Sequence, residues 1–264
     1  MKRKARSFIR EKKIFCGRKY LEVDIIPASD FLPAGKRSKK EYLTPPKIKN
    51  LNEKKARRHF VQLLNTNFGR DDLHVTLTYN PENLPVSIEA AQREAAKYIR
   101  RVKARRKKEG LPPLKYIIVT ECTSRDGIPI RIHHHVIMDA GLDRDTVENL
   151  WKTRNGKPIG FVNADRLQPD EKTGLEALAR YLTKSGARTK NQRRWSSSHN
   201  LAKPCSRNND HRYTRRKLER MAREETNNPD FWEKQYPGYY LTECRPEYND
   251  FSGWSIYLKF YRKE

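Results

Sequence analysis

Several features that mark common protein classes are scarce or missing in this sequence. Only four cysteines occur in 264 residues and none forms a CxxC pair. That spacing argues against a cysteine zinc site and against a dense disulfide framework, so a reducing cytoplasm is the expected location. No apolar stretch approaches a membrane span, and the basic N-terminus lacks the apolar core of a signal peptide. We therefore expect a cytoplasmic protein without membrane contact.

Acidic residues are also scarce relative to basic ones. Lys and Arg number 57 against 32 Asp and Glu, which gives a formal net charge of +25. Such a charge opposes compaction unless a polyanion offsets it, so nucleic acid is the expected partner. The sequence contains no phosphate-binding loop of the GxxxxGK[ST] type, so we expect no fused helicase. Any DNA unwinding would then require a host helicase.

The stretch from residue 73 to 167 predicts six elements in the order β-α-β-β-α-β. Alternating or continuous apolar residues mark its strands, and apolar residues at helical spacing mark its helices. The elements are strand 73–79, helix 87–108 with Ser87 as its N-cap, strands 115–121 and 131–138, a short helix capped by Asp143 or Asp145, and strand 159–167. This order is typical of an α+β protein with a ferredoxin-like (split βαβ) antiparallel sheet and helices on it.

Both ends of the chain look like additions to this pattern. Residues 1–72 form a basic N-terminal extension with one expected strand at 20–26 and a helix near 52–64. A helix beginning at Thr173, where Thr173 and Glu176 fit a capping box, follows the last strand of the pattern. Residues 201–264 predict a charged helix and two strands, which we expect to pack on the same domain.

Three consecutive histidines in one expected strand are the first candidates for chemistry. His133 and His135 share a face of the strand, whereas His134 points to the apolar face and is expected to pack there. Glu121 ends the neighbouring hairpin strand, so a carboxylate is expected beside the two imidazoles. Each residue alone would more often be an ordinary strand or surface residue. Two histidines and one carboxylate together suit Mg²⁺ or Mn²⁺, and also Zn²⁺ or Fe²⁺.

Tyr181 and Lys184 are the next candidates, because they share a face of the helix after the capping box. A tyrosine hydroxyl beside a metal-polarised phosphate can act as a nucleophile and leave a phosphotyrosine bond. A nearby ammonium can stabilise the phenolate or the charge that develops on phosphorus. A helical tyrosine three residues from a lysine is ordinarily a packing residue beside a solvated cation, so this hypothesis depends on the metal site.

Two basic segments are candidates for DNA contacts, although solvated charge is the default interpretation of any single member. One segment is the second half of the helix 87–108, and the other follows the tyrosine helix. Trp195 beside the second segment could stack on an unpaired base. The candidate DNA-binding residues are Arg100, Arg101, Arg105, Arg188, Arg193, Arg194 and Trp195.

These motifs together resemble the HUH endonucleases. Residues 131–138 resemble their His-hydrophobic-His signature, with His134 where a bulky hydrophobic residue is usual. Residues 73–79 resemble the first motif of the rolling-circle replication initiators of small phages, plasmids and integrative elements. Glu121 sits where the third metal ligand is expected, and residues 181–184 resemble the YxxK helix that carries the nucleophile. The histidines precede a single tyrosine, an order shared by these initiators and by single-tyrosine transposases.

The resemblance implies a strand-specific DNA nickase in a bacterial host cell, with residues 73–200 as the HUH endonuclease domain. Glu121, His133 and His135 would hold Mg²⁺ or Mn²⁺ at the scissile phosphate of single-stranded or extruded origin DNA. Tyr181, assisted by Lys184, would attack and retain the 5′ phosphate, which leaves a 3′ hydroxyl for a host polymerase. Two alternatives stay open. One is a single-tyrosine transposase, and the other is a non-catalytic nucleic-acid-binding protein on the same scaffold.

Overall fold

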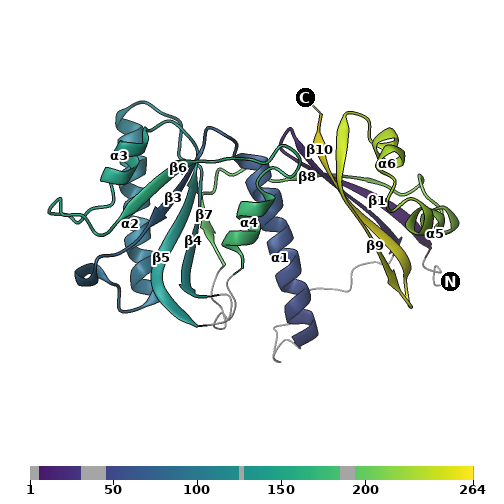
Figure 1. The fold of residues 1–264 in the computed structure, drawn as a ribbon, viewed down its shortest axis with the longest axis horizontal. Coiled ribbons are helices and arrows are strands. Elements are labelled where there is room, and N and C mark those ends of the chain that lie inside the picture. The colour runs from purple at the N-terminus through teal and green to yellow at the C-terminus, as the bar shows by residue number, and fades with distance from the viewer. Residues whose placement is uncertain (1–5, 31–45, 125–127, 185–193, 264) are drawn as a thin grey trace. The chain divides into compact units, whose positions relative to one another are not determined.

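The computed structural model describes residues 6–30, 46–124, 128–184 and 194–263. The chain divides into two compact units, and each contains a five-stranded antiparallel sheet with helices on it (Figure 1). Residues 67–169 and 175–202 form the central unit, and residues 1–66, 170–174 and 203–264 form the terminal unit. The expected α+β class is confirmed. Among the described residues, no helix combines the length and apolar character needed to cross a membrane.

The central unit contains the β-α-β-β-α-β order that the sequence predicts. All its strand pairs are antiparallel, in the order β6-β3-β5-β4-β7. The elements are β3 (Leu73–Leu77), the 3₁₀ turn η1 (Pro81–Asn83), α2 (Ile88–Lys108), β4 (Tyr116–Thr123), β5 (Pro129–Met138), α3 (Arg144–Asn149), β6 (Val162–Arg166), α4 (Glu176–Leu182) and β7 (Ser196–Ser197). The first four strands of that order follow the ferredoxin-like arrangement, in which the strands of the hairpin β4–β5 and the outer strands β3 and β6 interleave.

Side-chain caps fix the starts of two helices as expected. Ser87 accepts a hydrogen bond from the backbone of Ala90 at the start of α2, and Asp143 accepts one from Thr146 at the start of α3. The predicted capping box at Thr173 is wrong. The Thr173 hydroxyl donates to Asp170, and Gly174 has a left-handed φ of 59°, so α4 begins only at Glu176. A local turn therefore replaces the first turn of the expected helix.

The two faces of the central sheet differ in character. Leu73, Val75 and Leu77 of β3 and Val136 of β5 are buried in one apolar core with residues of α2 and α3. The residues between them in sequence point to the opposite face, which Figure 1 shows turned away from α2. That opposite face carries His74 and the two histidines on the same side of β5. The alternation along β3 and β5 therefore separates core from candidate site.

The terminal unit corrects the expected role of the chain ends. Its strands are β1 (Ser7–Cys16), β2 (Tyr20–Ser29), β8 (Cys205–Asn209), β9 (Tyr239–Asn249) and β10 (Gly253–Arg262), in the order β8-β1-β2-β10-β9. Residues 201–264 were expected to pack on the domain of residues 73–200, but β10 pairs with β2, with Ile256 opposite Ile25. The N-terminal segment is thus part of a sheet. Local alternation does not encode which distant strand is the partner, so sequence patterns could not reveal this pairing.

Helices cover both faces of the terminal sheet. Leu21, Val23 and Ile25 of β2 lie in a core with residues of α5 (Arg215–Glu224) and α6 (Pro229–Gln235). The alternate residues of β2 face α1 (Pro46–Asn67), whose Arg58 forms ion pairs with Glu22 and Asp24. Both parities of this strand are therefore buried, one in apolar contacts and the other in ion pairs.

Candidate metal centre

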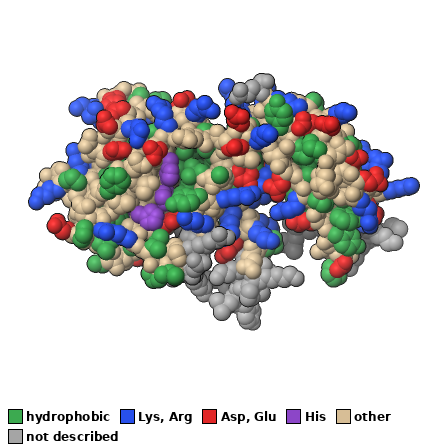
Figure 2. Space-filling view, viewed as in Figure 1, with side chains coloured by type: hydrophobic (Ala, Val, Ile, Leu, Met, Phe, Trp, Pro, Cys, Tyr) green, Lys and Arg blue, Asp and Glu red, His purple; other side chains and the backbone are tan. Residues whose placement is uncertain are grey.

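Glu121, His133 and His135 converge on the sheet face opposite α2. Glu121 of β4 lies directly across from His133 in the β4–β5 register, and His135 is two residues further along β5. One ligand atom from each of the three residues lies within 4.8 Å of those of the other two, and His133 Nε2 is 3.6 Å from Glu121 Oε2. Figure 2 shows histidine side chains gathered in a strip on this face of the central unit. The expected group is therefore assembled.

Two atoms of this group are buried without a hydrogen-bond partner in the structure. They are Oε1 of Glu121 and Nε2 of His135, in residues that are 2% and 4% exposed. A buried polar atom left unpaired costs about 1–3 kcal/mol, so native proteins seldom keep two together without a reason. A divalent cation accepts a carboxylate oxygen and an imidazole nitrogen as ligands, which would remove both penalties. The group could hold a metal ion.

Protonation equilibria in the group also suit a cation. Burial disfavours the charged form of Glu121, but the neighbouring His133 and the charge of Lys184 outweigh it, so the pKa of this carboxyl is lowered. The Glu121 carboxylate in turn raises the pKa of His133. Burial, assisted by His74 and His133, lowers the pKa of His135 to about 3. At neutral pH, Glu121 is ionised and His135 is uncharged, and these forms bind metals.

His74 is a site residue that sequence reasoning missed. Its Nε2 lies 3.0 Å from Nδ1 of His135, and the Thr76 hydroxyl lies 3.4 Å from the same nitrogen. For Nε2 of His135 to offer its lone pair to a cation, Nδ1 must carry the proton and donate it to such a neighbour. The alternation of residues 73–79 places His74 on the polar face, but only the β3–β5 register brings it to His135.

His134 is fully buried on the other face of β5. Its Nε2 lies 2.7 Å from the hydroxyl of Tyr79 and its Nδ1 lies 2.9 Å from that of Thr120. Its ring also lies edge-on to Trp151 in the core. Burial lowers the pKa of His134 to about 3. Both ring nitrogens are engaged, so His134 has no lone pair free for a cation, in agreement with its expected packing role.

Tyr181 lies on α4 beside the metal-ligand candidates. The centroid of its ring is 5.6 Å from that of His135, and the ring edge meets the imidazole at a steep angle. Nζ of Lys184 is 3.6 Å from the centroid of the Tyr181 ring. Tyr181 is 45% exposed, so an approaching polymer can reach it. A phenol, an ammonium and a potential cation site therefore occupy one accessible surface.

The expected DNA-binding residues lie in different places. Arg100 and Arg105 are exposed on α2, on the opposite layer from the metal group, and Arg105 is paired with Glu109. Arg101 is partly buried, with one guanidinium nitrogen 3.9 Å from Glu94. The remaining candidates fall after α4: Arg188 and Arg193 lie outside the described residues, and Arg194 and Trp195 are half-buried. Contact of these residues with DNA stays a prediction.

Comparison with protein families gives one match. Residues 72–186 match the family model of the ORF2-type replication-associated proteins, a span of less than half of the chain. The span contains the three metal-ligand candidates, Tyr181 and Lys184. The match is consistent with a replication initiator and implies an interaction with DNA. No curated protein and no solved structure matches the chain.

Proposed function

We propose that the protein is a metal-dependent nickase of the HUH type, which cuts and rejoins single-stranded origin DNA to initiate rolling-circle replication. The observation that carries this proposal is the joint placement of a possible metal group and an exposed tyrosine on one surface of the central unit. The family match supports the replicative role. The two partnerless buried ligand atoms favour this function over a non-catalytic nucleic-acid-binding protein.

In the proposed reaction, Glu121, His133 and His135 hold Mg²⁺ or Mn²⁺, which when bound polarises the scissile phosphate. The hydroxyl oxygen of Tyr181 forms a bond to phosphorus and loses its proton to solvent. The bond from phosphorus to the 3′ oxygen breaks, and that oxygen takes up a proton from solvent. The ammonium of Lys184, which lies against the Tyr181 ring, stabilises the phenolate. The 5′ polarity of the phosphotyrosine follows from the resemblance.

Rejoining requires the same residues to act in reverse. A free 3′ hydroxyl attacks the phosphotyrosine, and the Tyr181 oxygen leaves as the phenolate that Lys184 stabilises. Because bond energy is retained in the phosphotyrosine, no nucleotide cofactor is needed. His74 holds the His135 ring with its Nε2 toward the other ligand candidates throughout the cycle.

A covalent-adduct assay tests this proposal. Incubating the protein with labelled origin single strands and Mn²⁺ should give an adduct that survives denaturing electrophoresis. Tyr181→Phe removes only the nucleophilic oxygen and should abolish the adduct. Tyr240→Phe changes an exposed tyrosine of the terminal unit in the same way and should leave the adduct unchanged. Undiminished adducts in Tyr181→Phe would contradict the assignment, and joining of two element ends would favour a transposase.

A further inference from the structure

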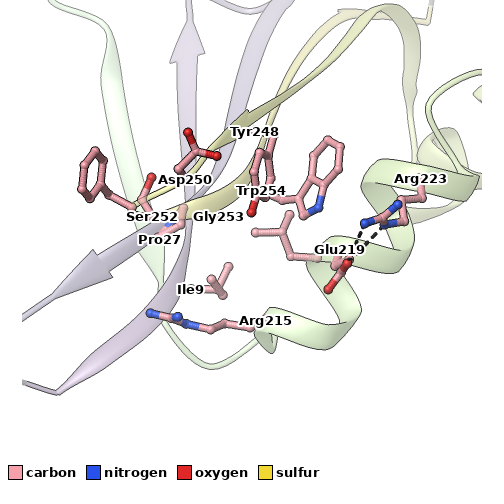
Figure 3. Close-up of a pocket in the computed structure, with 12 residues that line it drawn as sticks. Ile9, Pro27, Arg215, Glu219, Arg223, Tyr248, Asp250, Ser252, Gly253 and Trp254 are labelled. Carbon is pink, nitrogen blue, oxygen red and sulfur yellow. Dashed lines mark hydrogen bonds and ion pairs between the residues drawn. The ribbon is translucent and has the colours of Figure 1, made fainter.

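A pocket of about 520 Å³ in the terminal unit is independent of the residues considered so far. Figure 3 shows Tyr248 and Trp254 on its β9–β10 side and Arg215 and Arg223 on its α5 side. Ile9 and other apolar side chains of β1, β2 and α5 complete the lining. The volume lies within the range of about 300–1,000 Å³ that is typical of ligand pockets.

The hairpin side of the pocket presents aromatic rings to solvent. Tyr248 is 61% exposed, and Phe251 at the hairpin tip is completely exposed. The rings of Tyr248 and Trp254 lie 5.2 Å apart, and the indole Nε1 of Trp254 is buried with no hydrogen-bond partner among the described residues. Clustered exposed aromatic rings mark a binding surface, because leaving them in water is unfavourable.

The α5 side supplies held positive charge and two acceptors. The Arg223 guanidinium lies 5.5 Å from the Trp254 ring centroid and donates to Glu219, as the dashed lines in Figure 3 mark. Arg215 donates to the hydroxyl of Ser7 at 2.9 Å. These contacts hold both guanidinium groups at the pocket. The carboxylates of Glu219 and Asp250, which also line it, can accept hydrogen bonds from exocyclic amino groups of bases.

We propose that this pocket binds an unpaired base of single-stranded DNA. The base stacks on Tyr248 and Phe251, and its flanking phosphates contact Arg215 and Arg223. Aromatic rings beside cationic side chains are the usual means of holding unpaired strands, and the chain's net charge of +25 favours a polyanion over a peptide. Bases within a duplex are already stacked and cannot enter. The choice of DNA as the strand rests on the proposed nickase function.

Fluorescence anisotropy of labelled oligothymidylate tests the proposal, with full-length protein in EDTA so that no cleavage occurs. Tyr248→Ala and Phe251→Ala should each raise Kd about tenfold, the effect of losing one stacked base. Tyr240→Ala is the matched control, since Tyr240 is an exposed tyrosine of the same strand outside the pocket. Arg215→Ala should weaken binding more than Arg216→Ala, an equal change of charge elsewhere on α5.

Equal Kd values for Tyr248→Ala, Phe251→Ala and Tyr240→Ala would overturn the proposal. Equal weakening of duplex binding would do so too, because a stacking site needs an unpaired base. Phe251 contributes no buried surface, so its variant reports on binding even if Tyr248→Ala folds poorly. The adduct assay separates the two proposals. Normal Tyr181 adducts with binding indifferent to the pocket overturn the pocket alone, whereas pocket-dependent binding without adducts overturns the nickase alone.

Discussion

Each unit of the molecule buries one cluster of charged and polar side chains, and the two clusters differ in completeness. In the terminal unit, Arg58 donates to both Glu22 and Asp24, and Gln62 donates to Glu22 as well. All four carboxylate oxygens in that cluster accept a hydrogen bond, with Tyr20 completing Glu22. In the central unit, Glu121 and His135 each keep one buried atom without a partner. Burial of charge therefore does not distinguish a binding site, but incomplete pairing does.

The same contrast separates neighbouring histidines on β5. His134 and His135 are both buried and both have a pKa lowered to about 3. His134 has a hydroxyl at each ring nitrogen, whereas His135 has a neighbour only at Nδ1. A perturbed pKa indicates burial in both cases. The free lone pair on Nε2 is what makes His135 a ligand candidate.

The largest expected effect is on the completed cluster. Arg58→Ala leaves Glu22 and Asp24 buried without their cation, and breaking such a cluster costs about 3 kcal/mol of unfolding free energy. That value is at the lower end of the usual range because the Arg58 side chain is 36% exposed, so water can replace part of its interaction. Urea unfolding measures the change. Arg57→Ala, an exposed neighbour on α1, should change stability by less than about 0.5 kcal/mol. A similar loss in both variants would contradict the ranking.

The second prediction reverses the first by changing the incomplete cluster. Glu121→Gln keeps the size of the side chain but removes the anionic ligand, so Mn²⁺ affinity should fall about 100-fold or more. The unfolding free energy in EDTA should change by less than about 1 kcal/mol, because Glu121 already has an unpaired buried oxygen. Calorimetric titration with Mn²⁺ measures the affinity. Glu22→Gln is the matched variant, expected to lower stability and leave Mn²⁺ binding unchanged. The opposite pattern would refute the comparison.

The central unit was predictable because its information is local. Alternation along residues 73–79 and 131–138, the Ser87 cap and the hairpin were enough to give the order of the elements and to bring Glu121 beside His133. The terminal sheet was not predictable, because Ile25 pairs with Ile256 and nothing near either residue specifies the other. β1 carries charged residues in its middle that ion pairs such as Arg10–Asp210 compensate, so it did not read as a strand. His74 was missed for the same reason, since it depends on register.

His74→Ala should have a smaller effect than loss of a ligand. Without His74, the His135 ring loses its closest hydrogen-bond partner at Nδ1, and Nε2 is less firmly oriented. Removing such a supporting residue typically lowers metal affinity about 10–100-fold. His74→Gln, which can still place an amide oxygen near Nδ1, should recover part of the affinity. Mn²⁺ titration measures both variants. Equal losses in Ala and Gln would show that the His74 imidazole does more than accept this hydrogen bond.

The smallest predicted effect is on pH dependence, and it follows from His134. Its pKa is about 3 in the folded protein, against an ordinary value of 6.5 in the unfolded chain. Between these values the unfolded chain binds a proton that the folded protein does not, so stability falls as pH falls. Lowering the pH from 7 to 5 in EDTA should therefore cost the wild-type protein about 1–2 kcal/mol more than His134→Gln.

Urea unfolding at the two pH values measures this difference, and the comparison of slopes removes any constant loss of packing in His134→Gln. His199→Gln removes an exposed histidine and controls for the change in composition. Repeating the measurement with saturating Mn²⁺ then separates the two buried imidazoles. A cation on His135 must be released before that ring can be protonated, so Mn²⁺ should steepen the wild-type loss of stability on acidification. The difference caused by His134→Gln should persist, because both nitrogens of His134 are already hydrogen-bonded. A difference that vanished with Mn²⁺ would instead make His134 a ligand.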